Sequence, residues 1–345
     1  MKHNWGYKPF AKVLKTITPT SKIDKSEYKL SGIYPIISQE DTFISGYWNN
    51  NDDVTQHSSP VVIFGDHSRV LKYIDFEFVV GADGVKIIQP TDLLSAKFLY
   101  HFLKWYKVPS LGYARHFKLL KEINYPVPPM ETQEQIVAEL DQINDLIAKN
   151  RELLSQLDAL AQSLFYDTFG DPMTNPKGWG TQHFESCIHK IKYPSKKLLT
   201  TEYFSSGKYP IVSQEDSLIS GYSDREDCVF HISNPVIVFG DHTRILKYVS
   251  FSFVLGADGV KILSPINTLS PRYFYFCLLL FKIPSLGYSR HYKLLKELKI
   301  PIPPLALQED FAAKVEAIEA QKAKVEAEIA ELQTLLDARM DYWFN

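Results

Sequence analysis

One module occurs twice in this chain, at a single fixed offset. Residues 34–134 align with residues 209–309 at a shift of 175 positions without a gap, and roughly 57 of the 101 paired positions are identical. Solenoid repeats are about 20–50 residues long and need three or more copies to bury a continuous core. The repeat therefore predicts two complete domains, and two near-equal domains suit a partner that has an approximate two-fold axis of its own.

The length and the cysteines limit the class of protein. The 345 residues are enough for two domains with separate cores plus additional segments. Cys187, Cys228 and Cys277 have no counterparts in the other copy, so they predict no disulfide framework and indicate a reducing, cytoplasmic location. The sequence shows no signal-peptide pattern, and the apolar run 273–281 is too short to span a bilayer, so no membrane association is expected.

The charge is unevenly distributed along the chain. The segment 131–171 holds nine acidic and two basic residues, and the segment 306–345 holds nine acidic and four basic residues. Because the whole chain has a net charge of −2, the remainder carries +10. Basic modules joined to acidic segments are typical of a nucleic-acid-binding domain on a solvated scaffold. Duplex DNA also has the two-fold symmetry that the repeat suggests.

Both acidic segments have the spacing of a coiled-coil helix. Apolar residues recur at steps of three and four, with one polar residue in each seam. The two seams consist of Ile136, Leu140, Ile143, Ile147, Asn150, Leu154, Leu157, Ala161 and Leu164, and of Phe311, Val315, Ile318, Lys322, Val325, Ile329, Leu332 and Leu336. Proline-rich stretches at 126–129 and 301–304 predict an extended entry into each helix.

Within the first module, short β-branched and aromatic runs predict strands at 61–64, 76–80 and 85–88. Helical spacing is found at 93–106 and 118–123. The patterns predict an α+β fold with a twisted antiparallel or mixed sheet. The order along the chain is module, helix, module, helix, with boundaries at 1–130, 131–170, 171–305 and 306–345.

Two long helices that each follow a copy of one module are able to pair antiparallel along one seam. Thirty helical residues span roughly 45 Å at about 1.5 Å per residue, which is the length of about 13 base pairs. The expected arrangement is an intramolecular coiled coil with a pseudo-two-fold axis and one module at each end. Each module would then contact its own short tract of DNA.

The sequence argues against two kinds of catalytic site. Asp66, Asp83 and Lys86 resemble the two-acid-plus-lysine set of metal-dependent nucleases, but the lysine follows Asp83 by three residues where that motif needs two. His67 beside Asp66 is too small a set for zinc. The proline pairs 128–129 and 303–304 lack the other residues of a DNA amino-methyltransferase loop, and no glycine-rich cofactor turn follows a strand. We therefore expect a non-catalytic chain without a metal or cofactor of its own.

The polar residues that recur in both modules favour DNA recognition instead. Arginine and lysine bind phosphates and guanine edges, and glutamine suits adenine. The candidates are Gln39, Arg69, Lys72, Lys86, Tyr113, Arg115, His116 and Lys118 in the first module and Gln214, Arg244, Lys247, Lys261, Tyr288, Arg290, His291 and Lys293 in the second. Any one of them alone is more often a solvated charge or a packed side chain, so the prediction depends on the set. Arg69, Arg115 and His116, with their counterparts, are the first choices.

Two copies of one motif resemble a known family. The strings INYPVPPMETQEQIVAEL (123–140) and LKIPIPPLALQEDFAAKV (298–315) are similar to the I-P-x-P-P-x-x-x-Q-x-x-I entry to the conserved helices of type I restriction–modification specificity subunits. FYDTFGDPMTNPKGW (165–179) is similar to the stretch that this family places between its first helix and its second recognition domain. The resemblance covers essentially the whole chain, and the second copy of the motif departs from the first at 307–310.

The resemblance implies a non-catalytic specificity subunit. Each module would be a target recognition domain, and the coiled coil would space the domains and dock two modification subunits. These partners would bring S-adenosylmethionine and adenine methylation, and restriction subunits would bring ATP, magnesium and cleavage. The alternatives are a subunit of a type IIB or IIG system, a stand-alone palindrome-binding nuclease or methyltransferase, and a structural coiled-coil protein that does not bind DNA.

The similarity of the two modules predicts a property of the target. Near-identical modules are expected to read a nearly symmetric, interrupted palindrome. Residues 48–57 differ from their counterparts 223–232, and any asymmetry between the two half-sites is expected to arise there.

Overall fold

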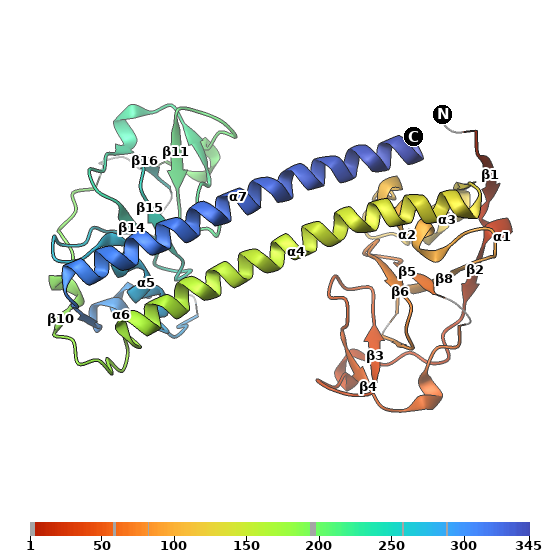
Figure 1. Ribbon diagram of the computed structural model, residues 1–345, viewed down its shortest axis with the longest axis horizontal. Helices are drawn as coiled ribbons and strands as arrows, with labels where there is room; N and C mark the ends of the chain where they lie inside the picture. The colour runs from red at the N-terminus through yellow and green to blue at the C-terminus, as the bar shows by residue number, and fades with distance from the viewer. Residues whose placement is uncertain (1–3, 58–59, 82, 194–197, 257–258, 288) are drawn as a thin grey trace. The chain divides into compact units, whose positions relative to one another are not determined.

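The computed structural model describes residues 4–57, 60–81, 83–193, 198–256, 259–287 and 289–345. The chain separates into two compact units, unit 1 with residues 1–151 and 326–345 and unit 2 with residues 152–325. Each unit holds one module and parts of two long helices, α4 (Met130–Phe169) and α7 (Leu305–Phe344) (Figure 1). The predicted α+β architecture with two modules and two long helices is confirmed.

The described residues of the first module form three sheets. An antiparallel sheet has the order β2–β8–β5–β6, a mixed sheet has the order β4–β3–β7, and β1 pairs with β9. The strands are β1 (Gly6–Pro9), β2 (Leu14–Ile17), β3 (Tyr34–Ile37), β4 (Gly46–Trp48), β5 (Val61–Gly65), β6 (Leu71–Ile74), β7 (Val79–Val80), β8 (Val85–Pro90) and β9 (Asn124–Val127). The helices are α1 (Phe10–Val13), α2 (Ala96–Tyr106) and α3 (Phe117–Glu122).

The local sequence accounts for these elements. The apolar run of β5 is buried along its whole length, and α2 lies against β5, β6 and β8. The helix expected from residue 93 begins at Ala96, because the Ser95 hydroxyl accepts a hydrogen bond from Phe98 N (3.1 Å) and caps it. The strand expected at 76–80 is shorter, and only β7 pairs, parallel to β3.

The second module repeats this design. Its sheets have the orders β15–β14–β17 and β12–β11–β16–β13, and β10 pairs with β18. The strands are β10 (Thr181–His183), β11 (Tyr209–Val212), β12 (Gly221–Ser223), β13 (Val229–Phe230), β14 (Val236–Gly240), β15 (Leu246–Val249), β16 (Phe253–Leu255), β17 (Val260–Leu263) and β18 (Lys299–Pro301). The helices are α5 (Pro271–Leu280) and α6 (Tyr292–Lys296). The three cysteines are buried free thiols.

In unit 1, the end of α7 packs against the beginning of α4 and against α2. Phe344 lies with its ring centroid 5.6 Å from that of Phe98 and joins the same core as Ile136. Arg339 forms an ion pair with Glu139, and the Glu139 carboxylate also accepts a hydrogen bond from Trp343 Nε1 (3.0 Å). An early residue of α4 thus meets late residues of α7, so the two helices run antiparallel there.

In unit 2, the beginning of α7 packs against the end of α4. Phe311, near the beginning of α7, packs its ring 5.6 Å from Phe165 and 5.3 Å from Phe169, near the end of α4. Lys322 in the seam donates a hydrogen bond to Asp158 (2.7 Å). The predicted seam is thus confirmed, with Lys322 partly solvated and paired. In unit 1, by contrast, the Asn150 side-chain nitrogen is buried without a hydrogen-bond partner among the described residues.

A buried glutamine joins each module to its long helix. In unit 1 the amide nitrogen of Gln133 donates to the carbonyl oxygens of Leu93 (2.9 Å) and Pro128 (3.0 Å), and its amide oxygen accepts from Ser95 N (2.8 Å). In unit 2 the amide nitrogen of Gln308 donates to the carbonyl oxygens of Thr268 and Pro303, and its amide oxygen accepts from Ser270 N. The glutamine of the motif after the prolines therefore anchors the first turn of the helix to the start of α2 or α5.

Candidate nucleic-acid interface

Four repeated loops meet at one end of the first module. They contain Gln39, Asp66, Asp83 and His116, and the surface that they form is called the loop face below. Direct hydrogen bonds connect them, including one from Asp66 N to Gly84 O (2.7 Å). The strings that recur most closely between the two copies are therefore neighbours in space.

The FGDH and ARH strings form a buried hydrogen-bond lock. His116 Nδ1 donates to the carbonyl oxygen of Asp66 (2.9 Å), and His116 Nε2 accepts from Leu111 N (2.9 Å). The two bonds require the neutral tautomer with its proton on Nδ1, because the backbone carbonyl only accepts and the backbone amide only donates. The Asp66 carboxylate accepts from Phe117 N (2.8 Å) and caps the start of α3. Asp66 is thus a structural residue.

The second module contains the same lock. His291 bonds to the carbonyl oxygen of Asp241 (3.0 Å) and accepts from Leu286 N (2.9 Å), and the Asp241 carboxylate accepts from Tyr292 N (2.7 Å). His116 and His291 are both fully buried. The prediction that His116 and His291 contact DNA is wrong, because each ring lies inside the fold with both nitrogens already hydrogen-bonded.

Lys72 and Lys247 are also structural. The Lys72 ammonium donates to the carbonyl oxygens of Ser38 (3.0 Å) and Thr42 (2.6 Å), and the Lys247 ammonium donates to Ser213 O (2.9 Å). Burial lowers the pKa of both ammonium groups. Because both side chains are buried, the prediction that they contact phosphates is corrected. Each lysine holds the loop that follows β3 or β11.

Gln39 links three loops of the face. Its amide nitrogen donates to Asp83 O (3.1 Å), and its amide oxygen accepts from His67 N (3.2 Å). Gly84 has φ +96°, and a Cβ there would lie 2.5 Å from the Gln39 amide, so the turn needs glycine at this point. Gln214 likewise accepts from His242 N (3.4 Å). The Gln39 amide is engaged at both its nitrogen and its oxygen, and the Gln214 amide at its oxygen, so neither presents the free bidentate edge that adenine recognition needs.

The remaining candidates lie at the surface around these locks. The exposed candidates of the first module are Arg69, Tyr113, Arg115 and Lys118, and Lys86 is half-buried. The exposed candidates of the second module are Arg244, Arg290 and Lys293, and Lys261 is half-buried. Tyr288 lies outside the described residues. The loop face therefore combines a fixed internal framework with exposed cationic side chains.

Arg69 and Arg244 adopt an uncommon backbone conformation. Their φ angles are +63° and +64°, in the left-handed region that residues with a Cβ rarely occupy. Each guanidinium also donates to a loop carbonyl, Arg69 to Val108 (3.1 Å) and Arg244 to Ile283 (3.0 Å). The same strained geometry in both copies fixes the direction of each arginine.

Acidic groups balance part of the positive charge. Asp83 pairs with Lys22 (2.6 Å), and Glu40 pairs with Lys25 (2.5 Å). The hydrogen bond from Lys22 lowers the pKa of the Asp83 carboxyl, and Arg115 and Lys86 contribute to the same direction. Asp83 therefore has a cationic surrounding, while Asp66 is used inside the lock. Within the described residues, no group of three or more His, Cys, Asp or Glu side chains is placed to hold a metal ion.

Sequence reasoning missed two residues of this surface. His67 and His242 are exposed on the loop face, and both follow the aspartate of the lock. The sequence argument treats His67 only as a metal ligand and does not include His242. The signal in the sequence is their place in the repeated FGDH string, where each follows a buried aspartate, Asp66 or Asp241.

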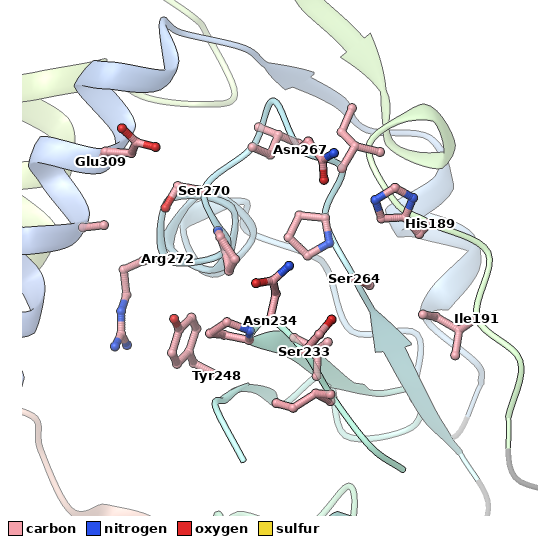
Figure 2. Close-up of a pocket in the computed structure, with 18 of the residues that line it drawn as sticks. His189, Ile191, Ser233, Asn234, Tyr248, Ser264, Asn267, Ser270, Arg272 and Glu309 are labelled. Atoms are coloured by element: carbon pink, nitrogen blue, oxygen red, sulfur yellow. The ribbon is translucent and has the colours of Figure 1, made fainter. Parts of the chain in front are cut away.

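A separate groove in unit 2 has a volume of about 770 Å³. Figure 2 shows His189, Asn234 and Asn267 around it, with Arg272 and Glu309 on the side of α5 and α7. The Arg272 guanidinium lies 3.7 Å from the centroid of the Tyr248 ring. The groove contacts the beginning of β14, whereas the Asp241 lock follows its end, so the groove is distinct from the loop face.

Comparison with known proteins gives the family. The family model described as type I restriction modification DNA specificity domain matches twice, over residues 4–159 and 184–334. The chain belongs to this family. The two matches follow the two copies of the module and extend into the long helices, so each family domain includes a part of α4 or α7.

Relatives of this DNA specificity family are similar over most of the chain. The Escherichia coli type I restriction enzyme EcoR124I/EcoR124II specificity subunit is 24% identical over 75% of this chain and 68% of its own length. The Methanocaldococcus jannaschii MjaIX specificity subunit is 23% identical over 76% of this chain and 69% of its own length. The crystal structure of the type I S subunit from M. genitalium has the same fold, with a TM-score of 0.63, 15% identity, and coverage of 98% of this chain and 96% of that one.

None of the helices in the described part of the chain combines the length and apolar character needed to cross a membrane.

Proposed function

We propose that this chain is the non-catalytic subunit that gives a type I restriction–modification system its DNA sequence specificity. The observation that carries the proposal is the duplicated loop face, which places exposed arginines and lysines on the same internal framework in both modules. Each module reads one half of a bipartite site in duplex DNA. Phosphate contacts position the modules, and side chains that reach base edges give the specificity.

The two half-sites have the same or nearly the same sequence. The framework of Gln39, Asp66 and His116 recurs in the second module, so the exposed residues around it are presented in the same way. The two modules differ in the segments that follow β4 and β12, at the tips of these strands. Trp48 Nε1 donates to the Asp53 carboxylate (2.8 Å) in the first module, whereas Arg225 pairs with Asp227 (3.0 Å) in the second. These tips are where the two half-sites diverge.

Sequencing of methylated adenines in the host genome tests this proposal. A strain with the gene should carry one interrupted motif with near-identical halves in inverted order, and a strain that lacks the gene should lose this methylation. A motif with two unrelated halves would contradict the symmetry, and methylation that persists without the gene would contradict the function.

Two modification subunits dock on the long helices, and restriction subunits join the assembly. The support is a row of exposed leucines on α4 at heptad spacing, Leu146, Leu153 and Leu160, which lie outside the internal seam. S-adenosylmethionine, ATP and magnesium belong to these partners. The chain works in the cytoplasm, where its DNA target is.

Purified chain tested alone separates this proposal from an enzyme. The chain by itself should neither methylate nor cut DNA, and addition of the modification subunit should restore adenine methylation. Methylation or cleavage by the chain alone would favour the stand-alone enzyme. A partner that both methylates and cleaves would favour a type IIB or IIG system.

A further inference from the structure

The segment between Leu111 and His116 forms a closed, rigid tip on the loop face. One imidazole closes it, because His116 follows the tip and accepts the hydrogen bond of Leu111 N (2.9 Å) at its beginning. Gly112 N also donates to the Ser110 hydroxyl (3.3 Å), and Gly112 has φ +69°. The tip is thus fixed at both ends by the buried lock rather than by its own side chains.

Tyr113 lies at this tip with its side chain fully in solvent. Its relative exposure is 105%, whereas Tyr125 in the same module is completely buried. Leu111 beside it is 40% exposed. The Tyr113 ring stacks on no other described aromatic residue. A rigid loop that holds an aromatic side chain away from its own fold is prepared for contact with another molecule, because little conformational entropy is lost on binding.

The surroundings of the tip favour a nucleic acid over a protein partner. Arg115 and Lys118 follow Tyr113 and are exposed, and Lys86 lies 5.7 Å from the centroid of the Phe117 ring at the base of the tip. An aromatic ring flanked by cations matches the chemistry of a base flanked by phosphates. The rigid closure also suits insertion between bases, because a flexible loop would bend away.

We propose that Tyr113 is a wedge that enters the base stack of one half-site and holds a base step open. This proposal rests on the proposed function and adds a mechanical role to it. Adenine methylation requires the target base to leave the stack, and unstacking requires a few kcal/mol. A side chain that fills the opened step, together with the phosphate contacts of Arg115, lowers that requirement for the partner that carries out the chemistry.

The second module has the same tip as far as the structure describes it. Leu286 N donates to His291 Nε2 (2.9 Å), and Gly287 has φ +65°. Arg290 is exposed, as Arg115 is. The sequence places Tyr288 at the position that matches Tyr113. Each half-site is therefore expected to have its own opened step.

Fluorescence of 2-aminopurine tests the wedge directly. The full chain is assembled with its modification subunit and titrated onto duplexes that carry the methylation motif, with 2-aminopurine placed at each position in turn. Unstacking raises the fluorescence of this base, so binding of the wild-type complex should produce a rise at one step in each half-site. The variants are Tyr113→Ala with Tyr288→Ala, the conservative pair Tyr113→Phe with Tyr288→Phe, and the control Tyr7→Ala, which removes another exposed tyrosine of the first module (40%) on β1.

The alanine pair should abolish the rise and weaken binding by about five- to 150-fold for each stacked ring lost, as measured for base–aromatic stacking. The phenylalanine pair and Tyr7→Ala should keep both the rise and the affinity. The unfolding midpoint of Tyr113→Ala alone should equal that of the wild type, because the Tyr113 side chain is fully exposed.

Three results would overturn the wedge. Tight, motif-specific binding without a fluorescence rise at any step would leave the proposed function intact and remove the wedge. An alanine pair that keeps the rise would do the same. An alanine pair that no longer assembles with the modification subunit would show that the tip binds protein. A wild-type complex without preference for the motif would instead contradict the proposed function itself.

Discussion

His116 donates a hydrogen bond from Nδ1 to the carbonyl oxygen of Asp66 at 2.9 Å, and this bond spans 50 residues of sequence. The same relationship joins His291 to Asp241 at 3.0 Å. In each module this hydrogen bond joins two of the repeated loops from inside the fold. The most strongly repeated strings of the chain therefore contain buried structural residues, the histidine and the aspartate of each pair.

Substitution of His116 by alanine should destabilise the first module. It removes two hydrogen bonds, opens a cavity, and leaves Leu111 N without its partner, whereas Asp66 O keeps the bond from His116 N (2.8 Å). The free energy of unfolding should therefore fall by about 2–4 kcal/mol. Urea denaturation measures this loss. His67→Ala is the matched control, because His67 is exposed, and it should change stability by less than about 0.5 kcal/mol. Equal stability of the two variants would show that the lock is not important for the fold.

Lys72→Met should behave as a stability variant rather than a binding variant. The methionine fills the same space but leaves the carbonyl oxygens of Ser38 and Thr42 without a donor, at a loss of about 2–3 kcal/mol. The salt dependence of DNA binding should not change in the protein that remains folded. A flatter salt dependence in Lys72→Met would restore this lysine to the DNA contacts.

Arg115→Ala combined with Arg290→Ala should weaken DNA binding and reduce its salt dependence. Each arginine that neutralises a phosphate contributes about one to the slope of log K against log salt, so the slope should fall by about two. Filter binding or fluorescence anisotropy between 50 and 200 mM salt measures it, which is about the range where such contacts dominate. Lys149→Ala with Lys324→Ala removes two charges from the helices and should leave the slope unchanged. Unaltered affinity in the arginine pair would exclude both residues.

Stability of the first module should fall below about pH 6.5, and His101 should be the cause. His101 is buried on α2, and its ring bonds to Asp141 (2.9 Å), which also pairs with Lys97 (2.6 Å). Desolvation lowers the pKa of His101 from its usual 6.5, more than Asp141 raises it, and Lys97 and Lys104 add to the lowering. As the pH falls through 6.5, the unfolded chain therefore binds the proton first, and the free energy of unfolding decreases.

The second module supplies the control for this pH dependence. Phe276 occupies the position that matches His101 and is buried without a titratable group. His101→Phe should therefore remove the loss of stability between pH 7.5 and 5.5 that thermal unfolding of the wild type reveals. A variant with the same pH dependence as the wild type would assign the effect to another group.

Leu146→Gln, Leu153→Gln and Leu160→Gln together should weaken assembly with the modification subunit while the chain stays folded. Burial of these exposed side chains in an interface stabilises it by about 1 kcal/mol each, so the dissociation constant should rise about a hundredfold. Co-purification and analytical ultracentrifugation measure the change. Leu30→Gln, which alters a fully exposed leucine outside the helices (101%), should assemble normally. Normal assembly of the triple variant would place the docking surface elsewhere.

The periodic parts of the chain could be predicted from the sequence, and the roles of the repeated polar residues could not. The heptad seams and the strands follow from local apolar spacing, which the structure confirms. Repetition shows that two positions share a constraint, but it does not separate a buried hydrogen bond from an exposed contact. His116 and Arg115 are adjacent and equally repeated, yet one is buried and the other is exposed.

One signal for Lys72 was present in the sequence. Alternation along β6 places Lys72 on the same face as Ile74, and both are buried, whereas Leu71 and Tyr73 are half-buried. The side chain could therefore have been assigned to the inner face once the strand was recognised. For His116 no such local signal exists, because its partner Asp66 is remote in sequence and becomes a neighbour only in the fold.

The buried glutamine at each junction attaches the module to its long helix through a few local contacts. Gln133 and Gln308 bond to groups that their own module and its proline entry provide, through the same three contacts in each unit. A recombination event that exchanges the segment between two such junctions carries the complete attachment with it. A chain with an exchanged module would thus keep the contacts that join the module to its long helix, while the exposed side chains that the module presents would change.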